Sequence, residues 1–92
     1  MRKTTRQIKA AFEAGKSRTI GNTSTDGQSV WLHGNEIIRR EHDGTIKFTL
    51  AGWNTVTTRE RVNGITGAGV YQKQFEPMRN GELISSSAWY TV

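Results

Sequence analysis

Cysteine is absent from the 92-residue sequence, proline occurs once, and no apolar run approaches the roughly 20 residues that a membrane span needs. The absence of cysteine excludes disulfides and thiolate metal sites, which fits a reducing compartment. The start, MRKTTRQIKAAF, has a basic head without the apolar stretch of a secretory signal. Because so short a chain buries only about 60–65% of its unfolded surface, it has little room for a deep active-site cleft. We expect a soluble cytoplasmic protein with a single domain spanning residues 1–92.

Positive charge is concentrated at the start of the chain. The net charge is +5, and residues 1–18 contain six of the 13 basic residues but only one acid, Glu13. The remaining 74 residues carry equal numbers of basic and acidic side chains, so the whole surplus belongs to the N-terminal segment. Such a patch attracts polyanions, such as nucleic acid or an acidic protein face. A solvated helix face that aids solubility has the same composition.

Two short stretches, TTRQ at Thr4–Gln7 and TTRE at Thr57–Glu60, have the pattern of a capping box that begins a helix. After the first, apolar residues recur at helical spacing: Ile8, Ala11 and Phe12. Gly15 then suits the left-handed residue that ends a helix. We therefore predict a first helix over residues 5–14. The second box predicts a short helix over residues 58–63 that ends at an Asn-Gly pair.

The middle of the sequence alternates as strands do. Apolar and β-branched residues between turn signals predict four strands, at residues 19–25, 29–33, 36–40 and 45–50. Asp-Gly pairs are strong hairpin signals, so successive strands are expected to pair as a four-stranded antiparallel meander. After the second helix, residues 70–75 and 82–84 predict a C-terminal β-hairpin around an Asn-Gly turn, and residues 88–92 an edge strand or a tail. The predicted class is α+β: N-terminal helix, meander, short second helix and C-terminal β-hairpin.

The capping box explains how each helix begins, but it does not explain why an arginine stands inside it. This arginine is Arg6 in the first box and Arg59 in the second. With the threonine as N-cap, the arginine takes the second helical position, where a cation opposes the helix dipole and costs roughly 0.3–1 kcal/mol. A guanidinium beside free N-terminal amides suits phosphate or carboxylate, which predicts an anion-binding role. The alternative is an ion pair with an acid elsewhere in the fold, or an arginine that faces solvent.

Evidence for catalytic chemistry is weaker. His33 and His42 have acids nearby and would suit a metal or nuclease site, but their spacing matches no common ligand pattern and each falls at a predicted turn. The serines lack a nucleophile elbow, and the glycine-rich NGITGAGVY has no P-loop lysine. We therefore expect no catalytic residue, metal or cofactor. Trp31 and Trp53 suit core filling first, with base stacking or a protein interface as the alternatives.

Four stretches of the sequence resemble a known group of proteins: TRQIKAAFEAGKSRTIGNTSTDG, VWLHGNEI, AGWNTVTTRERVNG and VYQK. They are similar to a family of small proteins carried mostly by tailed phages and prophages, and the resemblance covers residues 4–74. None of the shared motifs encodes a known chemistry. In length, basic charge and general character, the chain is also similar to anti-CRISPR proteins that block the type I-F surveillance complex. That resemblance implies inhibition by binding to the assembly of Cas proteins and guide RNA, which hinders target-DNA recognition.

We therefore predict a phage accessory protein that acts by binding and is not an enzyme, in the cytoplasm of a bacterial host. Its partner is expected to be a host nucleoprotein, such as Cas proteins with guide RNA, with no membrane and no small-molecule substrate involved. A module that binds DNA or RNA directly and a small metal-dependent nuclease are the alternatives. The predicted partner-binding residues are Arg2, Lys3, Arg6, Lys9, Lys16, Arg18, Asn22, Arg59 and Arg61.

Overall fold

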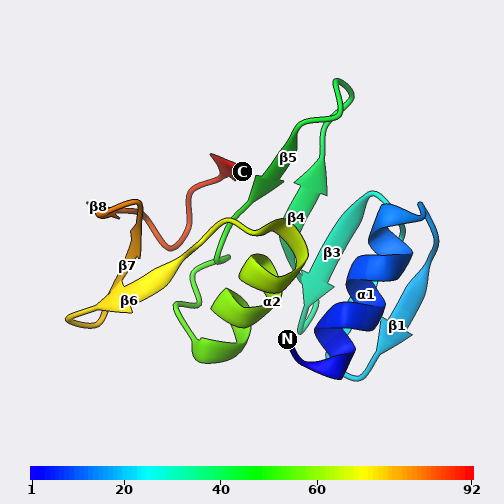
Figure 1. Ribbon diagram of the computed structural model, residues 1–92, viewed down its shortest axis with the longest axis horizontal. Helices are drawn as coiled ribbons and strands as arrows, with labels where there is room; N and C mark the ends of the chain where they lie inside the picture. Colours follow the sequence, from blue (N-terminus) through cyan, green and yellow to red (C-terminus); the bar gives the residue numbers. More distant parts are fainter.

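The computed structural model describes residues 1–92 and consists of two helices and nine short strands (Figure 1). The order of helices, strands and C-terminal hairpin confirms the predicted α+β class. Neither helix has the length and apolar character that crossing a membrane requires. In chain order the elements are α1 (Lys3–Glu13), β1 (Arg18–Ile20), β2 (Thr23–Thr25), β3 (Ser29–Leu32), β4 (Asn35–Arg40), β5 (Ile46–Phe48), α2 (Val56–Thr66), β6 (Tyr71–Lys73), β7 (Glu76–Arg79), β8 (Glu82–Leu83) and β9 (Tyr90–Thr91).

Six strands form one antiparallel sheet in the order β1-β2-β3-β4-β5-β9. The first five follow the chain, so the predicted meander is present in a sheet that is wider than four strands. The predicted strand 19–25 is in fact two strands, because Gly21 (φ +56°) and Asn22 turn the chain between β1 and β2. The other added strand, β9, lies within residues 88–92, which were predicted as an edge strand or a tail, and it forms an edge of the sheet by pairing with β5. A second sheet, β6-β7-β8, lies to one side and contains the predicted Asn-Gly turn (Figure 1). The predicted pairing of residues 70–75 with 82–84 is wrong, because β8 pairs with β7, a strand that contains Pro77, and β6 pairs with the other edge of β7.

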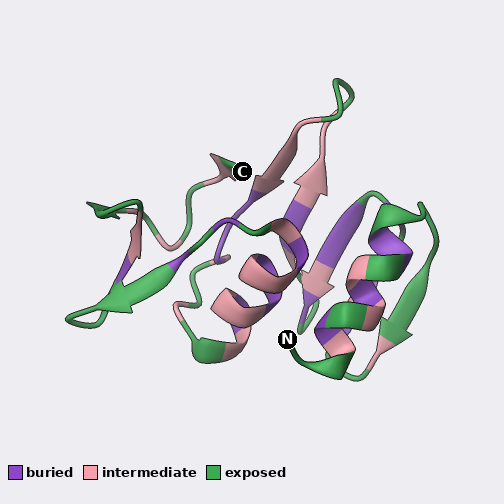
Figure 2. Ribbon diagram, viewed as in Figure 1, coloured by how far each residue is buried: buried purple, intermediate pink, exposed green.

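The two helices bury the apolar side of the large sheet. α1 packs against β1 and β2, α2 packs against β4, and the helices contact each other. Figure 2 shows the buried residues on the inner sides of both helices and along the central strands. The core between them consists of Ile8, Phe12, Val30, Leu32, Ile37, Ile38, Phe48, Leu50, Val62, Ile65, Ala68 and Val70.

α1 begins two residues earlier than predicted, and the predicted capping box does not form. The N-cap is Arg2, whose side chain makes no capping bond. Thr5 is fully buried instead, and its hydroxyl donates to Glu60 Oε1 of α2 at 2.8 Å. A bond between the two helices thus replaces the local cap. The prediction for Gly15 is confirmed, since it follows the helix with a left-handed φ of +68°.

α2 also begins two residues early. Its N-cap is Thr55, whose Oγ1 accepts the backbone N–H of Thr58 at 3.1 Å, so the predicted cap at Thr57 is wrong. With these starts, Arg6 and Arg59 each take the fourth helical position instead of the second. The dipole effect is confined to the first turn, so the electrostatic argument against an arginine at these positions is weaker than predicted.

The Asn-Gly pair that was predicted to end α2 lies inside the helix. α2 ends instead at Gly67, which has a left-handed φ of +72°. Gly64 lies where the helices approach closely, because a Cβ at this position would be 2.5 Å from Thr5 Cγ2. The glycine therefore permits helix packing and does not stop the helix.

A bulge interrupts the pairing of β3 with β4. Val30 pairs with Ile38, whereas Trp31 pairs with Glu36, so Ile37 has no partner across the ladder. Two adjacent residues, Ile37 and Ile38, are buried as a result, with 1% and 0% of their surface exposed. Strict strand alternation fails at this point, and Ile37 becomes part of the wall of a pocket beside the β3–β4 turn.

Candidate functional site

Six basic side chains are gathered on and beside α1. We call this set the α1 basic surface: Arg2, Lys3, Arg6, Lys9, Lys16 and Arg18. Lys9 is half-buried and the other five are exposed. The protein has two ion pairs, Arg39–Glu36 and Arg61–Glu60, and neither involves this surface. Its six charges are therefore not neutralised by acids within the fold.

The α1 basic surface follows the length of the helix. Arg2, Arg6 and Lys9 recur at intervals of four and three residues, which places them in one row away from the buried side of α1. Lys16 follows the C-terminal end of the helix, and Arg18 begins β1, which runs beside α1 (Figure 1). An extended row of cations suits an extended anion better than a single carboxylate.

Arg59 of the second TTR motif is engaged within the protein. Its guanidinium donates to the side-chain oxygens of Asn54 and of Gln72, the latter at 3.2 Å. Both partners are neutral amides, so the ion pair that we considered is not formed and the charge of Arg59 stays uncompensated. The side chain links the start of α2 to β6, and its anion-binding role stays a prediction.

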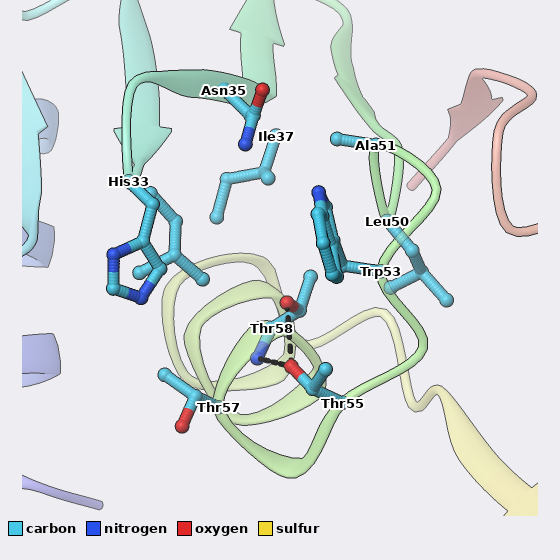
Figure 3. Close-up of a pocket in the computed structure, with 10 residues that line it drawn as sticks. His33, Asn35, Ile37, Leu50, Ala51, Trp53, Thr55, Thr57 and Thr58 are labelled. Carbon is cyan, nitrogen blue, oxygen red and sulfur yellow. Dashed lines mark hydrogen bonds between the residues drawn. The ribbon is translucent and has the colours of Figure 1, made fainter.

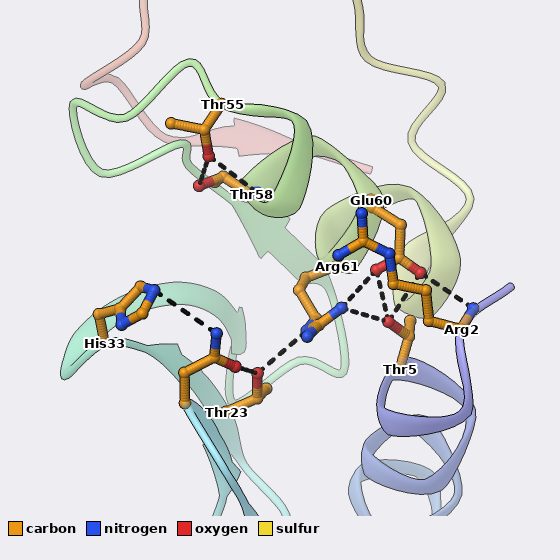
Figure 4. A network of polar contacts seen from close by, with 9 residues as sticks. Arg2, Thr5, Thr23, His33, Thr55, Thr58, Glu60 and Arg61 are labelled. Carbon is orange, nitrogen blue, oxygen red and sulfur yellow. Dashed lines mark hydrogen bonds and ion pairs between the residues drawn. The ribbon is translucent and has the colours of Figure 1, made fainter.

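Arg61 lies inside the protein, with only 5% of its surface exposed. Its Nε donates to Thr23 Oγ1 at 3.0 Å, and its NH1 donates to Thr5 Oγ1 at 2.9 Å and to the Glu60 carboxylate (Figure 4). These bonds connect α2 to β2 and to α1. Arg61 is therefore a structural residue, and its burial leaves the guanidinium out of reach of a partner.

Glu60 is the acid of this buried network. Burial alone would raise the pKa of its carboxyl above the ordinary value of 4.5. The Thr5 hydroxyl, the Arg61 guanidinium and the Arg2 backbone N–H all bond to the carboxylate, and together they hold the pKa below that value. The negative charge is therefore stabilised in the folded protein.

Asn22 is exposed in the turn between β1 and β2 and extends the network to the surface. Its Oδ1 accepts a hydrogen bond from the Thr23 hydroxyl at 2.8 Å, and its Nδ2 lies 3.5 Å from His33 Nε2. Figure 4 shows the resulting continuous set of polar contacts from Arg2 at the start of α1 to His33 in the β3–β4 turn. Asn22, one of the predicted binding residues, therefore links Thr23 and the Arg61–Glu60 pair to His33.

A pocket of about 490 Å³ opens beside His33 (Figure 3). It lies between the β3–β4 turn, the segment that joins β5 to α2, and the start of α2. Trp53 stands at its wall with 59% of its surface exposed, so the prediction that Trp53 fills the core is wrong. The apolar lining residues are Leu32, Ile37, Leu50, Ala51 and Trp53, and the polar ones are His33, Asn35, Thr55, Thr57 and Thr58.

Comparison with known proteins identifies the family. The family model described as Kyanoviridae Gp96 protein matches residues 1–91. The chain belongs to this family. No curated protein and no solved structure matches it. Since the Gp96 family is a phage family, the predicted membership of a small phage protein family is confirmed, and the resemblance to anti-CRISPR proteins stays a prediction.

In this Gp96-family protein the two histidines lie at opposite ends of β4. His33 is in the turn that precedes the strand and His42 is in the turn that follows it. A strand of this length spans about 20 Å, so the two rings do not share one site. No group of three or more histidine, cysteine, aspartate or glutamate side chains lies close enough to hold a metal ion.

The pocket of the Gp96-family protein was not predicted from the sequence. Its walls come from β3, β4 and the start of α2. In the chain, β5 and the loops on either side of it separate β4 from α2. One signal was present, although we interpreted Trp53 as a core residue: it stands between Gly52 and Asn54, outside the predicted strands and helices, where a large aromatic side chain has no regular core position. Asn35 and Thr57 had no such signal.

Proposed function

We propose that this phage protein acts by binding, without catalysis or a cofactor, in the cytoplasm of the bacterial host. It docks through the α1 basic surface on a host nucleoprotein that presents phosphates. The observation that supports this is the α1 basic surface itself: six cations within the first eighteen residues, five of them exposed and none in an ion pair.

Unneutralised charges of one sign repel one another and oppose compact folding, so an anionic partner is the simplest reason for such a cluster. The phosphates of a nucleic acid are spaced along a line, as are Arg2, Arg6 and Lys9 along α1. Neutralisation of phosphates by these cations releases counterions, so the affinity for the nucleic acid falls steeply with salt concentration. Asn22, which is exposed and both donates and accepts hydrogen bonds, adds a contact next to this surface.

The narrower form of the proposal is an anti-CRISPR role. Size and basic charge support it, through the resemblance to inhibitors of the type I-F surveillance complex. The protein would occupy a phosphate-lined groove of the Cas protein and guide RNA assembly, and so block target-DNA recognition sterically and electrostatically.

Size-exclusion chromatography tests both forms of the proposal. The protein is mixed with purified type I-F surveillance complex, and in parallel with the guide RNA alone, and target-DNA binding by the complex is then assayed. Co-elution with the complex and loss of target binding would support the anti-CRISPR role. Failure to co-elute, with target binding intact, would exclude it.

Direct binding of DNA or RNA is the second candidate, and the linear row of cations on α1 favours it. It predicts co-elution with guide RNA alone. A pull-down from host lysate with and without nuclease treatment separates the two candidates, because nuclease would abolish capture that depends only on nucleic acid. Capture of nothing under either condition would contradict both.

A further inference from the structure

We propose that the pocket beside Trp53 binds a nucleobase, which stacks on the indole and is read along its edge by Asn35 and Thr57. The inference rests on the proposed function in one respect: the nucleic acid that supplies the base also contacts the α1 basic surface. The pocket volume of about 490 Å³ is within the range of roughly 300–1,000 Å³ that small-molecule groups occupy.

Trp53 is presented by a segment with a fixed backbone. The N–H of Trp53 donates to Leu50 O at 2.8 Å, and the N–H of Thr55 donates to Trp53 O at 2.9 Å. On the preceding residue, the N–H of Gly52 donates to Ser86 O at 2.8 Å. The backbone that carries the ring therefore needs little ordering on binding, and an exposed indole face is a platform for any base.

Three polar groups of the pocket are free to bond to a ligand. Within the lining, Thr55 and Thr58 bond to each other, whereas the Trp53 indole N–H, the Asn35 amide and the Thr57 hydroxyl have no partner there (Figure 3). An asparagine amide both donates and accepts, which matches the paired donor and acceptor of a base edge. The pocket therefore offers a stacking face and an edge reader together.

Other ligand chemistries fit the lining less well. A quaternary ammonium group is held by several aromatic rings, and the pocket has one. A free anion would meet no lysine or arginine among the lining residues, and an aliphatic chain would leave Asn35 and Thr57 unused. A planar ring with hydrogen-bonding edges uses both the apolar and the polar walls.

The backbone on two sides of the pocket is held in an unfavourable conformation. His33 has φ +51° and Ala51 has φ +54°, a left-handed region that residues other than glycine rarely adopt. Both residues line the pocket. Through Asn22, His33 also connects to the network that reaches Arg2, so the pocket and the start of the α1 basic surface belong to one continuous set of contacts (Figure 4).

Fluorescence anisotropy with two labelled probes tests the inference. The probes are a single-stranded RNA of mixed sequence and an abasic ribose-phosphate strand of the same length. We expect the protein to bind the RNA about tenfold more tightly than the abasic strand, because the stacking of one base is worth that much. Trp53→Ala should lose this preference, and Trp53→Phe, which keeps a stacking ring, should retain most of it.

Phe75→Ala is the matched control, since Phe75 is an aromatic residue that is 88% exposed and does not line the pocket. It should keep the preference for the RNA. Adenosine monophosphate as a competitor then distinguishes the source of the base. Displacement of the RNA would support a free nucleotide, and no displacement, with the preference intact, would support a base within a strand.

Equal binding of the two probes by the unmodified protein would overturn the nucleobase inference. If Arg6→Glu combined with Lys9→Glu still weakened that equal binding, the proposed function would stand without the pocket. Binding of neither probe would also overturn the inference, and would leave only a protein face as the partner of the α1 basic surface.

Discussion

At the scale of single residues, Arg61 joins three elements of the fold. Its guanidinium bonds to Thr5 of α1, Thr23 of β2 and Glu60 of α2, and no buried side-chain nitrogen or oxygen of the protein lacks a partner. A buried charge is tolerated only when it is paired and hydrogen-bonded. Removal of Arg61 would leave the Glu60 carboxylate without its cation, in a site where only 21% of that side chain is exposed.

Arg61→Met, which keeps an apolar stem of similar length, is expected to lower the free energy of unfolding by about 3 kcal/mol, because one partner of a buried pair is removed. Urea denaturation followed by circular dichroism measures the change. Arg6→Met is the matched control: Arg6 is exposed and its side chain bonds to nothing, so we expect a change within about 0.5 kcal/mol. Equal losses of stability in the two variants would contradict the structural role of Arg61.

Glu60 should give the folded protein a measurable sensitivity to acid. The pKa of Glu60 is below 4.5 in the folded state, so its contribution to stability is present above that value and is lost as the pH falls through the folded-state pKa. Glu60→Gln does not ionise, and its stability should decline less over the same interval. Thermal unfolding at a series of acidic pH values measures both proteins. The same slope in both would exclude Glu60 as a source of the dependence.

The exposure of the α1 cations was predictable, whereas the burial of Arg61 was not recognised. Apolar residues at helical spacing defined the inner side of α1, so the cations had to lie outside. In α2, Arg61 is one turn before Ile65 and next to Val62, on the face that is buried. A charged side chain is not expected on a buried face without polar partners. The partners that permit the burial of Arg61, Thr5 and Thr23, lie more than 35 residues away in sequence, so they could not be recognised from it.

At the scale of elements, Gly64 determines how closely α1 and α2 approach. An Asn-Gly pair in a sequence usually marks a turn, and that local preference led to a predicted helix that was too short. A glycine is required inside this helix because Thr5 Cγ2 occupies the space that a side chain at position 64 would need. Packing against another helix overrode the local preference, and such packing is not visible in a single sequence.

Gly64→Ala is expected to destabilise the protein by about 1–3 kcal/mol, although alanine is the better helix former, because its Cβ would overlap Thr5 Cγ2. Combination with Thr5→Ser should recover part of the stability, since serine removes Cγ2 and keeps the hydroxyl that bonds to Glu60. Denaturant midpoints of the two single variants and of the double variant measure this. Additive destabilisation without recovery would contradict the steric explanation.

The same limit applies to the sheet and to the pocket. Hairpin turns fixed the order β2 to β5 from local signals such as Asp-Gly. The addition of β9 beside β5 depends on a two-residue strand more than 40 positions away, and the bulge that buries Ile37 breaks the alternation on which strand prediction rests. The pocket includes the bulge residue Ile37 and brings the β3–β4 turn next to the start of α2, so neither its position nor its lining followed from the sequence.

At the scale of the whole molecule, the charge is divided unequally over the fold. The α1 basic surface carries the net positive charge, while the residues after position 18 are neutral as a set. The pocket has no charged side chain among its lining residues. A nucleic acid that binds both regions would gain salt-sensitive affinity from α1 and salt-insensitive affinity from the pocket, so the two contributions are separable by ionic strength.

Arg6→Glu combined with Lys9→Glu should weaken binding of the anionic partner and reduce the slope of log affinity against log salt by about 1 for each phosphate that is no longer neutralised. The melting temperature should change little, because neither side chain is in an ion pair or in the core. The matched control is Lys47→Glu with Lys73→Glu, which lowers the net charge from +5 to the same +1 at positions outside the α1 basic surface. Titrations at several salt concentrations compare the two variants. If the affinity of both fell equally, net charge would drive the association and the α1 basic surface would have no specific role.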